Sequence, residues 1–149
     1  MTHAVGRSAS PWVARPAVSG FLGGLVWLGA LVVSHPTIAS PGEPGMTWGS
    51  WTVLVSFALL GLAVAYGLGR WGWSGSTSRL LATAVVLALA AALALWAPWS
   101  GWPHVFAATA LGLLVEHRRR VGSVSAATAV TRVLAGLAFA VATVLCLFT

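Results

Sequence analysis

The segment Leu80–Ala97 reads LLATAVVLALAAALALWA and contains no charged side chain. An α-helix needs about 20 predominantly apolar residues to cross a bilayer, with a working range of about 17–25. The eight leucines and valines in this segment favour insertion strongly enough to outweigh the single Thr83. The segment is therefore predicted to be a transmembrane helix.

The composition of the whole chain supports the same interpretation. Of its 149 residues, 58% are hydrophobic and 7% are charged, whereas a soluble domain carries about 25% charged residues. The chain has no Lys, Asp, Asn or Gln, so it cannot cover a globular surface with polar groups. The single cysteine, Cys146, excludes an internal disulfide and a cysteine-based metal site. Lipid rather than water is the predicted solvent.

Four further spans are predicted at about 17–34, 51–68, 99–115 and 129–148, and residues 1–16 form an N-terminal tail. The first apolar run exceeds the 7–15 residues of a signal-peptide core, so we expect a retained helix. Gly101 and Pro103 fall in the first turns of the fourth span, which is either a short full span or a broken, partly re-entrant one. The expected fold is an all-α integral membrane protein, a bundle of 4–5 transmembrane helices in one domain over 17–149.

The arginines predict the orientation. They lie before the first span, between the second and third, and between the fourth and fifth, whereas the alternate loops hold none: Arg7, Arg15, Arg70, Arg79, Arg118, Arg119, Arg120. Because topogenic cations remain in the cytoplasm, the N-terminus is predicted to be cytoplasmic, in a multi-pass protein of a prokaryotic inner (plasma) membrane. The same arrangement argues against nucleic-acid binding, since the arginines flank apolar segments instead of covering a soluble face.

Small residues form several patterns. Residues 67–72 match G-x-G-x-x-G, but a dinucleotide site needs a preceding strand, and we expect these glycines to end a membrane helix. Gly20 and Gly24 form a helix-contact signature, because glycines let two helix backbones approach closely. Two alanine series with the same spacing are interpreted as products of an alanine-rich composition: Ala84, Ala88, Ala92 and Ala138, Ala142, Cys146.

Candidate functional residues are few. His35, Glu43 and His104 fall on the predicted outer side, where they are chemically able to bind Zn²⁺ or relay protons. Their spacing matches no ligand motif, so we expect solvated loop residues, no metal and no cofactor. Glu116, beside the arginine cluster, is interpreted as part of an anchor with internal charge compensation. Arg132 is the one ionisable group expected inside a membrane helix, either as a functional site or as a snorkelling anchor.

The predicted spans contain few side chains that could take part in catalysis and no carboxylate. Their polar and reactive groups are Ser56, Tyr66, Thr83, Thr109, Arg132, Thr143 and Cys146. General acid–base catalysis requires positioned titratable groups, and a proton-coupled carrier requires them within the membrane. We therefore expect a protein that is not an enzyme and that supports another membrane protein.

The order of features along the chain resembles the small, TctB-type membrane subunit of tripartite tricarboxylate transporters. A first span is followed by the outer loop Pro41–Trp48 and by a span with a late glycine, Gly61. A Gly-aromatic corner at Gly101 then divides two spans, and the cluster Arg118–Arg120 precedes the last apolar run, Val133–Phe148. The resemblance implies a non-catalytic partner of a larger transport subunit, which takes up carboxylates delivered by an extracytoplasmic binding protein.

Three alternatives to this function remain open at the level of sequence. The first is a structural or assembly protein of the membrane with no transport role. The second is a small membrane enzyme of the terpene-cyclase type. The third is a haem-bearing redox anchor that uses His35 and His104 as axial ligands, although both are expected in loops.

Overall fold

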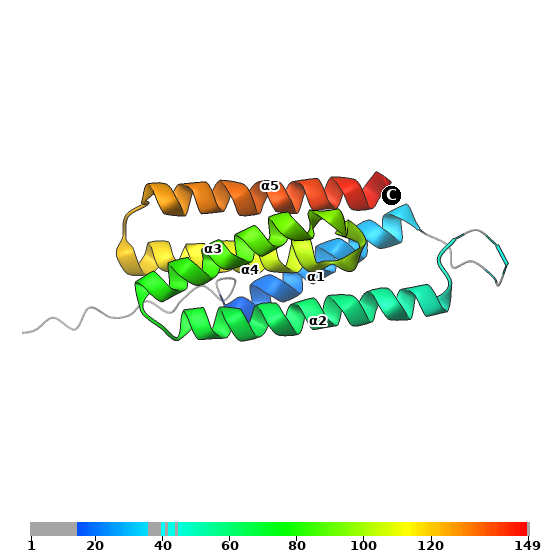
Figure 1. Ribbon diagram of the computed structural model, residues 1–149, viewed down its shortest axis with the longest axis horizontal. Coiled ribbons are helices and arrows are strands. Elements are labelled where there is room, and N and C mark those ends of the chain that lie inside the picture. The colour runs from blue at the N-terminus through cyan, green and yellow to red at the C-terminus, as the bar shows by residue number, and fades with distance from the viewer. Residues whose placement is uncertain (1–14, 36–39, 41, 44, 149) are drawn as a thin grey trace, which may run out of the picture.

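A computed structural model describes residues 15–35, 40, 42, 43 and 45–148 (Figure 1). The described residues form five α-helices and two short 3₁₀ turns, and they include no β-strand apart from an isolated bridge at Met46. The predicted all-α fold is confirmed. In chain order the elements are α1 Pro16–Ser34, α2 Trp48–Trp73, α3 Thr77–Leu93, η2 Ala94–Trp96, η3 Pro98–Ser100, α4 Trp102–Val121 and α5 Ala126–Phe148.

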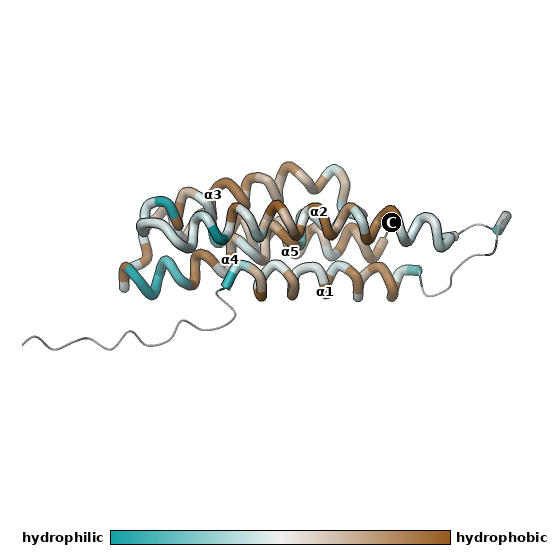
Figure 2. The backbone as a smooth tube through the Cα atoms, turned by 90° about the horizontal axis from the view of Figure 1, so that it is seen from below, coloured by the Kyte–Doolittle hydropathy of each residue, from teal (hydrophilic) through white to brown (hydrophobic). Residues whose placement is uncertain are grey.

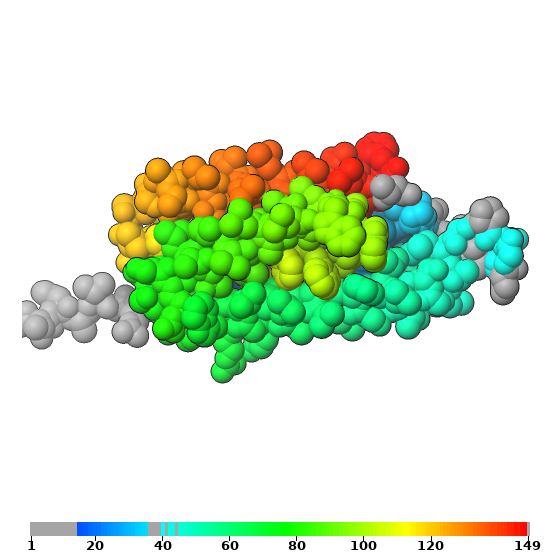
Figure 3. Space-filling view, viewed as in Figure 1, coloured from blue at the N-terminus to red at the C-terminus, as the bar shows by residue number. Residues whose placement is uncertain are grey.

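The five helices lie lengthwise beside one another, and α4 is the central one (Figure 1). It contacts α1, α2, α3 and α5. In the space-filling view α4, coloured yellow-green to yellow, is visible mainly at its two ends (Figure 3). The core between α3 and α4 is built of leucines and alanines that are completely buried, including Leu80, Leu87, Leu113 and Leu114.

Four helices are long and apolar enough to cross a membrane: α1, α2, α3 with η2, and α5. An uninterrupted helix covers most of the fourth predicted span, 99–115. Its first residues form the corner η3, after which α4 runs without interruption for 20 residues, or about 30 Å. Helix α4 is not among these four apolar helices because its last turns contain charged residues. Because four other helices surround it, α4 does not need a lipid-compatible surface.

The helices differ in length from the predicted spans because polar residues at a membrane interface continue a helix. Helix α2 begins at Trp48, where Thr47 caps it by accepting a hydrogen bond from the Ser50 N–H at 3.2 Å. It continues to Trp73, so the glycines of the G-x-G-x-x-G segment lie inside the helix and do not end it. Helix α3 is shorter than predicted, since it gives way to the 3₁₀ turn η2 at Ala94.

The polar residues of the bundle are concentrated at one end, as the hydropathy colours show (Figure 2). This end contains the start of α1, the α2–α3 turn and the α4–α5 turn, and with them six of the arginines: Arg15, Arg70, Arg79, Arg118, Arg119, Arg120. Arg7 and most of the predicted tail lie outside the described residues. The opposite end carries the loop with Glu43 and the exposed tryptophans Trp48, Trp96 and Trp99.

Candidate functional site

At the arginine end, Arg120 connects three parts of the chain. Its Nε donates to Glu116 Oε1 at 2.9 Å, Nη1 donates to the Gly75 carbonyl at 3.1 Å, and Nη2 donates to the Trp73 carbonyl at 2.9 Å. The Trp73 and Gly75 carbonyls belong to the end of α2 and the turn after it, which lack intrahelical donors. Arg120 therefore fastens the end of α4 to the α2–α3 turn.

Glu116 is 8% exposed and lies within α4, which continues past the end of the predicted span at residue 115. Its second carboxylate oxygen is 3.9 Å from Arg119 Nη1. Two arginines thus balance one carboxylate on the same helix turn, which is the internal charge compensation expected of this cluster. Nearby, the Arg79 guanidinium lies 4.8 Å from the centre of the Trp71 ring, a stabilising cation–π geometry.

His104 was predicted in a solvated outer loop, and this prediction is wrong. The residue belongs to the first turn of α4 and is completely buried. Its Nε2 lies 3.1 Å from the Thr143 hydroxyl of α5, and its ring meets Phe139 edge-on at 5.3 Å. Because Thr143 donates its own proton to the Phe139 carbonyl, the Nε2–H of His104 is the donor in this contact. Helix α4 begins earlier than its apolar run, which brings His104 into the core.

The other candidate residues do not join His104 in a common site. His35 ends α1, where its N–H donates to the Leu31 carbonyl at 2.8 Å, and Glu43 accepts the Ser40 N–H at 3.1 Å in the outer loop. Over the part of the chain that the structure describes, no three His, Cys, Asp or Glu residues gather where they could hold a metal ion.

Arg132 lies in the second turn of α5 and is half-buried. It is six residues from the start of the helix, or about 9 Å along the axis. Within residues 15–35, 40, 42–43 and 45–148, no hydrogen-bond or ion-pair partner is found for its guanidinium. A side chain of this length can reach the interface from that depth.

The contact between α1 and α4 depends on Gly20 and Gly23 rather than on Gly20 and Gly24. A Cβ at Gly20 would lie 2.8 Å from Thr109 Oγ1, and one at Gly23 would lie 2.5 Å from the His104 carbonyl oxygen. At Gly24 the nearest atom would be 3.8 Å away, an ordinary contact. The predicted spacing of four is therefore corrected to three.

The alanine series also form contacts, contrary to our interpretation of them as chance. Ala84 and Ala88 of α3, and Ala138, Ala142 and Cys146 of α5, are all at most 3% exposed, whereas Ala92 of the first series is only half-buried. A third series, not predicted from the sequence, lies on α2, whose buried residues are all glycine or alanine and recur every three or four positions: Ala58, Gly61, Ala65, Gly69, Gly72. The recurrence of small residues every three or four positions is the sequence pattern that predicts this contact face.

The outer corner between α3 and α4 is held by bonds that the sequence did not predict. Trp27 Nε1 donates to the Trp99 carbonyl at 3.1 Å, and Trp102 Nε1 donates to the Phe57 carbonyl at 2.7 Å. Gly101 has a φ of 77°, which favours glycine, and a Cβ there would lie 2.9 Å from the Trp27 ring. The indole N–H groups of two tryptophans therefore join the corner to α1 and α2.

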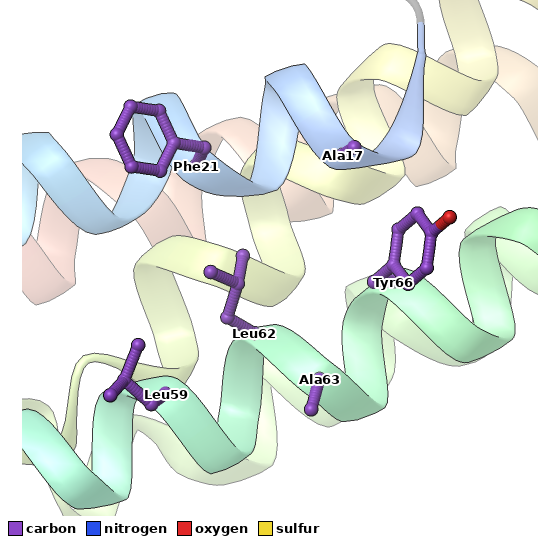
Figure 4. Close-up of a pocket in the computed structure, with 6 residues that line it drawn as sticks. All are labelled: Ala17, Phe21, Leu59, Leu62, Ala63 and Tyr66. Carbon is purple, nitrogen blue, oxygen red and sulfur yellow. The ribbon is translucent and has the colours of Figure 1, made fainter.

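Three hollows among the described residues have mainly apolar walls. The largest, about 380 Å³, lies between α1 and α2 (Figure 4). Next to it is one of about 150 Å³, which shares Phe21, Leu59 and Leu62 with the first. The third, of about 310 Å³, is lined by α1, α4 and α5. All three open on the outside of the bundle, where a membrane protein meets lipid or a partner.

No known protein family, curated protein or solved structure matches the chain.

Proposed function

We propose that this protein is a small, non-catalytic subunit that supports a larger membrane transport protein of the tricarboxylate type. The observation that carries the proposal is the contrast between the inside and the outside of the bundle. Inside, His104 bonds to α5 and Thr109 to its own helix backbone, while at the arginine end the buried Glu116 and the exposed Arg120 fasten α4 to the α2–α3 turn. Outside, the hollows are apolar and open toward the membrane.

A carrier acting alone needs polar or ionisable groups along a path through the membrane. Here the axis of the bundle is filled by α4, whose residues from Pro103 to Leu114 are mostly buried against the other helices. The polar groups His104 and Thr109 within that stretch make hydrogen bonds, His104 to α5 and Thr109 to its own helix backbone. We therefore assign the solute path to the partner. This chain would support the partner without carrying the solute itself.

The hollow between α1, α4 and α5 is the surface that we assign to a transmembrane helix of the partner. Small residues form its floor where α1 meets α4: Ser19, Gly23, Ala108 and Gly112. A floor without large side chains leaves room for a further helix above it. The exposed residue Val26 lies at its rim.

The proposal is tested by deleting the gene in the native host and measuring uptake of radiolabelled citrate. We expect uptake to fall at least tenfold and to return on complementation. The tagged protein, extracted in mild detergent, is expected to retain a polytopic membrane protein in a fixed ratio. Unchanged uptake together with a monomeric extract would contradict a transport role and favour a purely structural protein.

Val26→Trp tests the assigned surface. It should release the partner by filling the hollow, whereas Val32→Trp, an equally exposed change on α1 outside any described hollow, should not. Equal retention of the partner by both variants would contradict this surface.

The arginine end is proposed to face the cytoplasm of a prokaryotic cell, because cations flanking membrane helices remain on that side. With five helices, the N-terminus is then inside and the C-terminus outside. Fusions that report on compartment, placed before Pro16 and after Phe148, test this orientation. A reporter that is active outside the cell at the N-terminus would overturn it.

A further inference from the structure

The groove between α1 and α2 is open, long and apolar, and it has a basic mouth. We define it by the two adjoining hollows of about 380 and 150 Å³. Its walls are formed by Ala17 and Phe21 of α1 and by Leu59, Leu62 and Ala63 of α2 (Figure 4). Tyr66 closes the end near the start of α1.

The length of the groove corresponds to one membrane leaflet. Along α1 its lining runs from Ala17 to Leu28, a distance of eleven helical steps or about 16 Å at 1.5 Å per residue. Half of a hydrocarbon core of about 30 Å is about 15 Å. An extended acyl chain of a lipid in the leaflet at the arginine end would therefore occupy the groove over its whole length.

Two arginines lie at the mouth. The Arg70 Nη1 donates to the Tyr66 hydroxyl at 3.1 Å, which joins the apolar wall to a cation. At the same end α1 meets α2 so closely that a Cβ at Gly69 would lie 2.5 Å from the Pro16 side chain. Arg15 precedes Pro16 and Arg70 follows Gly69 in the chain, so two exposed arginines lie next to this contact.

We propose that the α1–α2 groove binds an anionic phospholipid, with one acyl chain between Phe21 and Leu62 and the phosphate on Arg70, Tyr66 and Arg15. Arginine and a phosphate make charge-assisted, often bidentate hydrogen bonds. Arg70 has further N–H donors beyond the one given to Tyr66, and the Tyr66 hydroxyl keeps its own proton to donate.

The charges at the mouth favour a lipid over a helix of another protein. An apolar helix in the groove would leave the two arginines without an anion, whereas an anionic lipid supplies one at that depth. Anionic lipids are also enriched in the cytoplasmic leaflet, on the side where cations flanking membrane helices remain.

The test is a lipid titration of the detergent-purified full chain, followed by native mass spectrometry. We expect one dioleoyl-phosphatidylglycerol to bind at least about tenfold more tightly than dioleoyl-phosphatidylcholine. Dihexanoyl-phosphatidylglycerol and inorganic phosphate should bind far more weakly, because neither fills the groove. Equal binding of the two long-chain lipids, or binding of phosphate as tight as that of the lipid, would overturn the proposal.

Variants separate the site from the general charge of the protein. Arg70→Gln should weaken phosphatidylglycerol binding about tenfold, the value of one hydrogen bond to a charged group. Arg118→Gln removes the same charge at the exposed end of α4 and should leave affinity unchanged. Tyr66→Phe keeps the packing and should weaken binding several-fold. Equal losses in Arg70→Gln and Arg118→Gln would show diffuse attraction and contradict the site.

The acyl chain is tested separately. Ala63→Phe fills the groove and should abolish tight binding, while Ala140→Phe places the same ring on the exposed face of α5, away from any described hollow. Melting temperatures identify variants that fail to fold, in which case Tyr66→Phe decides. A photocrosslinker at position 63 that labels a protein instead of lipid in native membranes would overturn the assignment.

Discussion

Helices α2 and α4 place opposite kinds of residues in the interior of the bundle. The apolar helix α2 buries five of its 26 residues, all of them glycine or alanine. The less apolar helix α4 buries twelve of 20, among them His104, Thr109 and Glu116. Hydropathy and burial are therefore inverted, because lipid solvates the large side chains of α2 while other helices enclose α4. The buried polar groups of α4 bond to Thr143 of α5 or within α4 itself.

This comparison teaches that the bundle is held by close backbone approach and by a few directed bonds, not by burial of large side chains alone. Lipid tails are as apolar as leucine, so helix association within a membrane relies on packing of small residues and on hydrogen bonds. Both are found where α4 meets its neighbours.

The largest expected effect is at the contact of α1 with α4. Gly23→Ala should lower the free energy of unfolding by about 3 kcal/mol, because the added Cβ would meet the His104 carbonyl at 2.5 Å. Gly67→Ala on α2, where no atom lies within 4 Å of the added Cβ, should leave stability unchanged or raise it by up to about 1 kcal/mol. Reversible unfolding in mixed micelles measures both. Similar losses of unfolding free energy in the two variants would contradict the conclusion that close packing against α4 matters more than the exposed surface of α2.

The next effect is at the arginine end. Arg120→Ala should cost about 2 kcal/mol, because Glu116 loses a charged partner and two backbone carbonyls lose their donors. The control on α2 is Arg70→Ala, whose side chain is exposed and is bonded only to Tyr66 in the same helix; it should cost less than about 0.5 kcal/mol. The same micelle unfolding assay applies. If Arg70→Ala lowered the free energy of unfolding as much as Arg120→Ala, the conclusion that Arg120 stabilises the bundle by fastening α4 to the α2–α3 turn would be wrong.

The sequence was sufficient to predict the apolar helices, since length and hydropathy alone define a membrane span. It also predicted the shared end of the arginines, because they recur in alternate loops. Hydrophilic residues do lie together at one end (Figure 2), where the helix ends and turns that carry six of the described arginines meet. The apolar spans and the positions of the arginines both depend on whether a segment faces lipid or water, and the composition of the segment indicates this directly.

The surroundings of α4 were not predictable in the same way. A hydropathy window over α4 is depressed by Glu116 and the arginines, and it does not reveal that other helices enclose the segment. The burial of His104 depends on Thr143, which is 39 residues away in the chain. The pairing of Gly23 with the backbone of α4 likewise depends on the rotation of α1, which a spacing of glycines leaves undetermined.

A smaller effect is expected at the bond between α4 and α5. Thr143→Val should cost about 1 kcal/mol, within the range measured for interhelical hydrogen bonds in membranes, because His104 Nε2 loses its partner at 3.1 Å. Thr52→Val on α2 removes a hydroxyl that bonds only to the backbone of its own helix, and it should change stability by less than about 0.5 kcal/mol. A double-mutant cycle of Thr143→Val with His104→Leu measures the pair directly. Additive losses would show that the two side chains do not interact.

The smallest effect should be at Arg132, on a helix whose burial lies between that of α2 and that of α4. Arg132→Ala should change the free energy of unfolding by less than about 0.5 kcal/mol, because the half-buried guanidinium has no partner among the described residues and lies about 9 Å from the start of α5. Citrate uptake should also remain unchanged if the side chain only snorkels. Lost uptake with unchanged stability, restored by Arg132→Lys, would instead show that α5 presents a charge to the partner. In that case the bundle would have three kinds of surroundings: the enclosed α4, the lipid-facing surfaces of the other helices, and a polar surface of α5 that faces another protein.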